Sequence, residues 1–352
     1  MTAPAAHTPL FPVGPTPPSL APGPGGRTGI VAVPAQAPGT DRDVAGITGR
    51  QEVRTGQPAP IVTPHAHKAQ PGQAHRAAAE AQQDAGRMLQ VNGAPLHVRD
   101  DGDGVPLVFV HGWSTSGGFF RKQTAELSRT CRVVAPDLRG HGRSAPAGGG
   151  HTVANYAADI AEVIRQLDLE RPVLVGWSMG AFIAYELLKQ HGSGNVRGLV
   201  VVDQGPTDFA FPDYPLGFFT LEGLLDCAYQ LQNDQVQFIQ DFLPAWLSAP
   251  SADDIDWMVD EMMAVSPLTA TASLFDQSIR DYRSFLPEIS VPTLLAFGSD
   301  DKLSNPENGP FTQTLIPDSS LVMFEKSSHL PFYEEPGKFN QALLDFVGSL
   351  PR

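Results

Sequence analysis

The sequence is poor in cysteine and in metal-binding patterns, and each shortage excludes a class of protein. Only two cysteines, Cys131 and Cys227, occur in 352 residues, too few for a small disulfide-rich fold. They lie far apart in sequence, so we expect two buried free thiols. No group of histidines and cysteines has metal-ligand spacing, and we predict neither a metal nor another cofactor.

Basic residues and long apolar runs are scarce as well. The chain has 24 Lys and Arg against 38 Asp and Glu, a net charge of −14, so we expect no nucleic acid or anionic membrane as partner. No apolar run approaches the roughly 18 residues of a membrane span. The N-terminus lacks the charged start and apolar core of a secretory signal. We therefore expect a cytoplasmic protein without a membrane span.

Residues 1–87 differ in composition from the rest of the chain. They contain 14 of the 33 prolines, with many Ala, Gly, Gln and Thr residues and almost no aromatic ones. Such a segment buries too little apolar surface to offset the entropy lost on ordering. We predict a disordered tail over residues 1–87 and a functional domain over residues 88–352. A chain that starts at Met88 is then expected to keep full stability and activity.

The domain alternates short apolar runs with stretches of helical periodicity, which is typical of βαβ units and a parallel sheet. Asn92-Gly93 predicts a hairpin at its start. The apolar runs predict buried strands at 107–110, 131–135, 173–175, 199–202, 292–297 and 320–324. The periodic stretches predict helices around 119–127, 154–167, 311–315 and 338–347.

The alternation stops between about residues 206 and 286. Helical stretches rich in aromatic residues and methionine take its place, at 221–230, 235–247, 253–265 and 269–282. We interpret this region as a helical cap inserted into the α/β domain. We expect most of these side chains to pack in the core. If the cap covers the site, some of them line the substrate pocket and predict a mainly apolar or aromatic substrate.

The most informative stretch is Gly176-Trp-Ser-Met-Gly180, which follows an apolar run and leads directly into an amphipathic one. It matches the G-x-S-x-G turn, in which a strained serine is pushed above the sheet edge. The two glycines are expected where a Cβ would collide with a neighbouring strand or helix. Alone the match is weak, because a glycine-rich strand-to-helix turn with an idle serine has the same sequence.

Ser178 needs a base and an orienting acid, and later strands offer both. His329 is the only histidine at a late strand end, so we predict it as the base. We predict Asp301 as the acid, with Asp203 and Asp300 as alternatives. All of these residues follow predicted strands, and the carboxyl ends of parallel strands share one edge of a sheet, so they can converge.

Two backbone N–H groups are expected to stabilise the negative charge that develops on the substrate oxygen. Met179 follows the nucleophile at a helix N-terminus, and Trp113 ends the His111-Gly112-Trp113 turn after an early strand. We predict both as oxyanion-hole donors. The alternative for the second motif is a tight turn with a buried tryptophan.

Residues 88–352 resemble the α/β-hydrolase superfamily. The resemblance rests on His111-Gly-Trp113, Asp137-Leu-Arg-Gly-His-Gly-Arg-Ser144, Gly176–Gly180, Gly298-Ser-Asp-Asp301 and Ser328-His-Leu-Pro-Phe-Tyr-Glu-Glu-Pro336. The segment looks most like small microbial carboxylesterases, including the cofactor-free haloperoxidase (perhydrolase) and pimeloyl-carrier-protein methyl esterase types. Ala181 and Ser328 stand where many relatives have glycine. The resemblance implies a mostly parallel sheet covered by helices on both faces, with a helical cap.

The motifs and the resemblance together predict a serine hydrolase that cleaves a carboxylic ester or related acyl substrate. Ser178 attacks the carbonyl, His329 takes its proton and later activates water, and Asp301 orients His329. The same triad would serve hydrolysis of a lactone, a thioester or a C–C bond, or perhydrolysis. A catalytically silent binding protein is the alternative from another class.

Overall fold

The computed structural model describes residues 86–144 and 146–351. The predicted disordered tail lies outside these residues, apart from Gly86 and Arg87, and stays a prediction. Arg87 already belongs to the first strand, and its guanidinium lies 2.8 Å from the carboxylate of Asp100 on the second. The chain therefore enters the sheet one residue before Met88.

Eight strands form one sheet in the order β1-β2-β4-β3-β5-β6-β7-β8. The strands are β1 (Arg87–Val91), β2 (Ala94–Asp101), β3 (Val105–Val110), β4 (Cys131–Pro136), β5 (Val173–Trp177), β6 (Gly198–Val202), β7 (Thr293–Gly298) and β8 (Ser319–Phe324). Strands β1 and β2 form the predicted hairpin, and Asn92 and Gly93 have φ values of 45° and 79°, as its tight turn requires. From β4 to β8 all neighbours are parallel, which confirms the predicted mostly parallel sheet.

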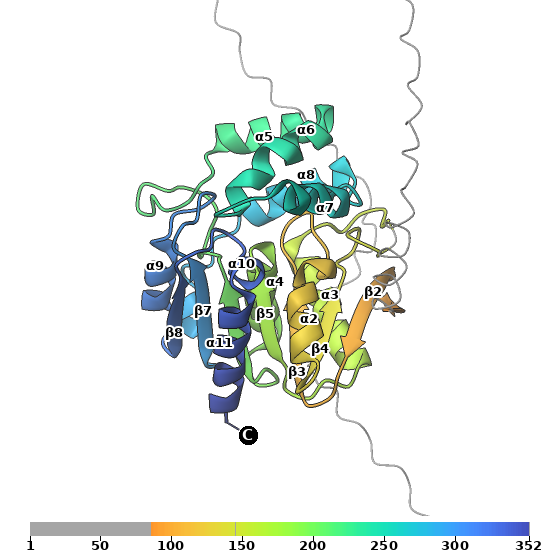
Figure 1. Cartoon of the computed structure of the whole chain (residues 1–352), viewed down its shortest axis with the longest axis vertical. Coiled ribbons are helices and arrows are strands. Elements are labelled where there is room, and N and C mark those ends of the chain that lie inside the picture. Colours follow the sequence, from red (N-terminus) through yellow and green to blue (C-terminus); the bar gives the residue numbers. More distant parts are fainter. Residues whose placement is uncertain (1–85, 145, 352) are drawn as a thin grey trace, which may run out of the picture. The chain divides into compact units, whose positions relative to one another are not determined.

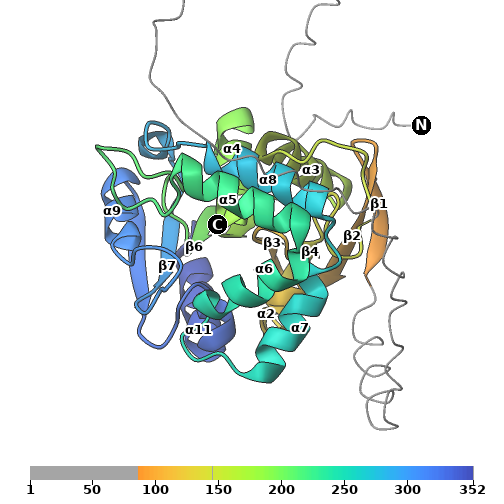
Figure 2. The same ribbon diagram turned by 90° about the horizontal axis from the view of Figure 1, so that it is seen from above.

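Helices cover both faces of the sheet. Figure 2 shows α3 (Val153–Gln166) and α4 (Met179–His191) on one side, and α2 (Arg121–Leu127) and α11 (Pro336–Ser349) on the other. Every residue of β5 and β6 is buried, which explains their uninterrupted apolar sequence. The remaining elements of the α/β part are η1 (Gly117–Phe120), η3 (Leu286–Glu288), α9 (Asn308–Leu315) and α10 (Pro331–Glu334). The four-residue α10 was not predicted, since it is too short to show periodicity.

The helical cap of the predicted fold lies between β6 and β7 in sequence. Figure 1 shows its helices stacked beyond one end of the sheet. They are α5 (Leu221–Asn233), α6 (Gln235–Phe242), η2 (Leu243–Trp246), α7 (Ala252–Met262) and α8 (Pro267–Ser278). Three of the predicted helical stretches each overlap one helix, and the stretch 235–247 covers both α6 and η2. Helix α8 ends four residues before the predicted end.

Local sequence explains where the cap helices begin. The side chains of Thr220, Asp234, Ser251 and Ser266 each accept a backbone N–H of the first turn of α5, α6, α7 and α8. Such caps satisfy one of the donors that a helix N-terminus leaves unpaired. Several of the aromatic and methionine side chains of the cap are buried core residues, as expected for most of them, among them Trp246, Met258 and Met262.

Two further expectations concern cysteines and membranes. Cys131 and Cys227 are both free, but only Cys131 is buried, and Cys227 on α5 is half-buried. The prediction of two buried thiols is therefore wrong for Cys227. No helix in the described part of the chain is long and apolar enough to span a membrane.

Candidate active site

Ser178 occupies the sharp turn between β5 and α4, and its backbone is strained. Its φ of 53° and ψ of −123° lie in a region that side-chain-bearing residues rarely adopt, at a cost of about 1–3 kcal/mol. Glycines make the turn possible, as predicted. A Cβ on Gly180 would lie 2.0 Å from the carbonyl oxygen of Val110, and one on Gly176 would lie 2.4 Å from that of Gly180.

Backbone hydrogen bonds between neighbouring strands continue past the strand ends and hold the site residues at the same edge of the sheet. The N–H of Ser178 donates to the carbonyl of Val202 at 3.0 Å, and the N–H of Asp203 donates to that of Ala296 at 2.9 Å. Ser178 and Asp203 therefore lie side by side at the carboxyl edge of the sheet. The loops after β7 and β8 continue the same edge, which brings Ser178 and His329 into one site although they lie far apart in sequence.

His329 is held by both the sheet and the cap. Its carbonyl accepts the indole N–H of Trp177 at 2.9 Å, and its N–H donates to the carbonyl of Trp246 at 3.0 Å. The imidazole is buried, with ring centroids 5.7 and 5.8 Å from these two indoles. Burial lowers the pKa of His329, and the charge of Asp301 opposes this shift. A neutral imidazole is the form that can accept a proton from a serine hydroxyl.

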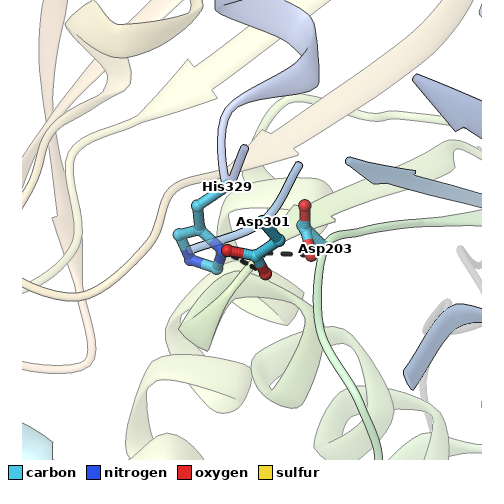
Figure 3. A group of neighbouring side chains, drawn as sticks. All are labelled: Asp203, Asp301 and His329. Atoms are coloured by element: carbon cyan, nitrogen blue, oxygen red, sulfur yellow. Dashed lines mark ion pairs between the residues drawn. The ribbon is translucent and has the colours of Figure 1, made fainter. Parts of the chain in front are cut away.

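Two carboxyl groups face His329 (Figure 3). Its Nδ1 lies 4.0 Å from Oδ1 of Asp203 and 4.0 Å from Oδ2 of Asp301. These distances are too long for hydrogen bonds, and neither ring nitrogen of His329 has a hydrogen-bond partner among the described residues. Catalytic hydrogen bonds are often long in unliganded enzymes and shorten when substrate binds.

The third candidate acid, Asp300, is directed elsewhere. Its side chain is half-exposed, its Oδ2 accepts the hydroxyl of Ser248 at 2.6 Å, and it lies 3.8 Å from the ammonium of Lys302. From the sequence alone, Asp203 and Asp300 were alternatives to Asp301 as the acid that orients the histidine. The structure instead brings two of the three to the imidazole.

The two carboxyls near His329 have different surroundings. Asp301 accepts the N–H of Leu303 at 2.8 Å and the hydroxyl of Ser304. Asp203 accepts only the N–H of Gly298, at 3.0 Å, and its Oδ1 has no partner among the described residues. Burial, with the neighbouring Asp301, raises the pKa of Asp203 well above its ordinary value. Asp301 is thus the better stabilised as a carboxylate.

The backbone of the loop after β3 runs beside the nucleophile. A Cβ on Gly112 would lie 3.3 Å from the Cβ of Ser178. The indole N–H of Trp113 donates to the carbonyl of Ala270 on α8 at 2.8 Å, which ties this loop to the cap. Met179 is the first residue of α4, where the helix leaves the N–H unused. Both positions suit the predicted oxyanion-hole donors, whose role stays a prediction.

Ser328, next to His329, links the loop that carries Asp301 to the cap. The sequence did not predict this link. Its hydroxyl donates to the carbonyl of Ala245 at 2.9 Å and accepts the N–H of Lys302 at 3.0 Å. Glycine at this position could make neither bond, so the side chain of Ser328 adds two contacts.

Most of the residues that line the pocket beside Ser178 are polar. It is lined by Ser178, Asp203, Gln204, Gly205, Thr207, Asp208, Phe218, Leu303, Ser304, Asn308 and His329. Burial raises the pKa of Asp208 to about 6, opposed by hydrogen bonds from the amides of Gln204 and Gln277. Phe218 and Leu303 are the only large apolar side chains in this lining, so the apolar or aromatic substrate stays a prediction.

Asp203, Asp301 and His329 also form the one group in the described residues whose ligand atoms, within 4.8 Å of one another, could hold a metal ion. Zinc bonds of 2.0–2.2 Å place tetrahedral ligand atoms about 3.4 Å apart. The separations of 4.0 Å around Nδ1 are wider than this. As placed, the three side chains therefore do not match a tetrahedral zinc site.

Known proteins resemble this chain in sequence and in structure. A family profile for the alpha/beta hydrolase fold matches residues 105–336. The AB hydrolase superfamily protein YisY of Bacillus subtilis (strain 168) is 30% identical, over 72% of this chain and 96% of that protein. The pimeloyl-[acyl-carrier protein] methyl ester esterase of Vibrio atlanticus (strain LGP32) is 31% identical, over 72% and 98%.

A non-heme haloperoxidase of Rhodococcus erythropolis is 30% identical, over 73% of this chain and 97% of that protein. Among solved structures, an esterase from Exiguobacterium antarcticum is similar with a TM-score of 0.72 and 29% identity. The similarity covers 75% of this chain and all of that one.

Proposed function

The chain belongs to the α/β-hydrolase family, and from this premise we propose that it is a serine hydrolase that cleaves a carboxylic ester or related acyl substrate. One observation carries the proposal. Ser178 is held in a strained turn at the same edge of the sheet as a buried histidine that faces two carboxyl groups. The esterases among the similar proteins support an acyl substrate.

In the proposed reaction, the hydroxyl oxygen of Ser178 attacks the carbonyl carbon of the substrate while Nε2 of His329 takes the hydroxyl proton. The N–H groups of Met179 and Trp113 stabilise the oxyanion. His329 then gives the proton to the leaving group, and the acyl-enzyme forms. Water attacks the acyl-enzyme with His329 again as base, which releases the acid and restores Ser178. Asp301 orients the imidazole and stabilises its charged form.

The direct test is turnover of a panel of p-nitrophenyl esters and lactones of graded size. We expect Ser178→Ala to lower kcat/KM at least about 10³-fold, because the attacking oxygen is removed. Ser320→Ala, which alters an exposed serine on the edge strand β8, serves as the matched control and should leave activity unchanged. Ester hydrolysis that survives in the Ser178→Ala protein would refute the proposal.

The second candidate is perhydrolysis, favoured by the similarity to a non-heme haloperoxidase. Here hydrogen peroxide replaces water as the attacking group on the acyl-enzyme and yields a peracid. Halide oxidation that depends on both acetate and hydrogen peroxide, and is lost in Ser178→Ala, would support it. A silent binding protein would turn over neither esters nor peroxide.

A further inference from the structure

We propose that Asp203 and Asp301 form a carboxyl pair that holds a single proton, carried by Asp203, and that Asp203 can replace Asp301 as the carboxylate partner of His329. The proposal rests on the proposed function, because it concerns the histidine of the same site. It differs from a triad with one acid in giving the imidazole two carboxyl partners on neighbouring strands.

The geometry of the pair carries the inference. Both carboxyls lie 4.0 Å from the same nitrogen, Nδ1 of His329, and are buried, with exposed fractions of 2% for Asp203 and 9% for Asp301. One ligand atom from each of the three side chains lies within 4.8 Å of the other two. Two carboxylates this close in a site shielded from water do not both ionise near neutral pH, so one proton remains on the pair.

The hydrogen bonds decide which carboxyl carries the proton. Asp301 accepts the backbone N–H of Leu303 and the hydroxyl of Ser304. These donors stabilise a negative charge. Asp203 has one donor and an unpartnered Oδ1, which a protonated carboxyl can use as a donor toward Asp301. The proton therefore belongs on Asp203.

The other acidic groups around Asp203 also favour its protonated form. Burial and the charge of Asp301 raise its pKa most, and Glu334 on α10 adds to them, while the N–H of Gly298 opposes. Glu334 is itself occupied, since it accepts the N–H groups of Ser328 and Ser248. The indoles of Trp177 and Trp246, which pack on His329, are uncharged.

The pair gives the site a reserve acid. When Asp301 is replaced by asparagine, the neighbouring negative charge that kept Asp203 protonated is removed. Asp203, at the end of β6, then ionises and can accept a hydrogen bond from Nδ1 of His329. When Asp203 is replaced by asparagine, a neutral side chain of the same shape replaces a neutral carboxyl. Its amide oxygen can still accept the N–H of Gly298, so the structure should be kept.

The test compares wild type, Asp203→Asn, Asp301→Asn and the double variant by kcat/KM for p-nitrophenyl acetate from pH 5 to 10. We expect Asp203→Asn to stay within about tenfold of wild type at pH 7, with the midpoint of its acid limb unchanged. We expect Asp301→Asn to exceed the double variant at least about tenfold. The double variant should show its acid limb shifted at least one pH unit lower, because the imidazolium has lost its counter-charge.

Two outcomes would overturn the carboxyl pair. One is a midpoint in Asp203→Asn at least one unit below wild type, which would mean that Asp203 is ionised. The other is equal activity in Asp301→Asn and the double variant, which would mean that Asp203 cannot serve the histidine.

An NMR titration of the His329 imidazole in the same four proteins repeats the comparison without a substrate. It tests the pair even if the chain hydrolyses no ester, so failure of the pair and failure of the proposed function are distinguishable. Thermal unfolding of each variant confirms that the compared proteins are folded.

Discussion

At the residue scale, the strained turn at Ser178 affects both reactivity and stability, and the two effects can be measured separately. The residue holds φ at 53° and ψ at −123°, which glycine adopts readily and other residues do not. Serine is retained there against the local conformational preference. Within the proposed mechanism, the nucleophilic oxygen is the reason for this strain.

Replacing Ser178 by glycine should therefore stabilise the protein while abolishing activity. We expect the free energy of unfolding to rise by about 1 kcal/mol, because part of the 1–3 kcal/mol of strain is relieved. Ser178→Ala is the control, since its Cβ keeps the strain and it should show no gain. Denaturant unfolding of the three proteins measures the difference, and equal stability of the glycine and alanine variants would contradict the account.

At the scale of elements, the sharp turn at Ser178 depends on close contact between α4 and its neighbours. Gly180 lies in the first turn of α4, where a Cβ would come within 2.0 Å of the carbonyl oxygen of Val110 on β3. Backbone atoms on both sides fix this distance. A methyl group is therefore accommodated only if helix and strand move apart.

Gly180→Ala should cost more than about 4 kcal/mol or prevent folding, as expected for a clash against fixed backbone. Gly337→Ala on α11 is the matched control, because nothing lies within 4 Å of the added Cβ. It should be neutral or stabilise by about 0.4–1 kcal/mol, as in other helical glycines. Urea unfolding compares the two, and a mild effect of Gly180→Ala would show that the turn is less constrained than the structure indicates.

Tyr333 fastens the cap helix α7 to the α/β part of the chain. Its hydroxyl donates to the carboxylate of Asp254 at 2.5 Å and accepts the indole N–H of Trp257 at 3.2 Å. The guanidinium of Arg121 lies 3.8 Å from the centroid of that indole. Tyr333 on α10 thus lies among side chains of α2 and of the cap helix α7.

Tyr333→Phe should lower the free energy of unfolding by about 1–2 kcal/mol, since it removes a hydrogen bond to a charged group and leaves an indole N–H unpaired. Hydrogen exchange should show α7 opening more often than in wild type. Tyr229→Phe, at an exposed position of α5 in the same cap, is the control and should change neither quantity. Unchanged exchange in α7 would contradict the fastening role.

Strand ends show how far the sequence alone could predict the site. Ser178 and His329 were predictable, because each follows an apolar run and carries a local motif. The joint approach of Asp203 and Asp301 was not, since it depends on β6 lying next to β7, with Val202 opposite Ala296. That pairing joins segments that are separated in sequence by the whole cap, so no local sequence pattern predicts it.

At the scale of the whole molecule, buried histidines make stability depend on pH. Burial lowers the pKa of His111, His141 and His329, and that of His141 falls to about 3. Between pH 6.5 and about 3, the unfolded chain binds a proton at His141 that the folded chain does not. Stability from this residue is therefore present above pH 6.5 and falls by about 1.4 kcal/mol per pH unit below it.

Raised pKa values at Asp203 and Asp208 act with the opposite sign, so the comparison of a variant with wild type isolates His141. In His141→Asn the new amide can donate to the carbonyl of Arg139, as Nδ1 does now. We expect its stability relative to wild type to improve by about 2 kcal/mol between pH 7 and pH 5. Urea unfolding at both pH values measures this, and a pH-independent difference would contradict the burial effect.

The central claim is that Ser178 is an activated nucleophile, and covalent labelling tests it most directly. A fluorophosphonate reacts only with a serine whose proton is removed by a neighbouring base and whose adduct is stabilised. We predict that wild type gains one phosphonate, which peptide mapping locates on Ser178, and that Ser178→Ala gains none. An unlabelled wild type, or a label on another residue, would contradict the account.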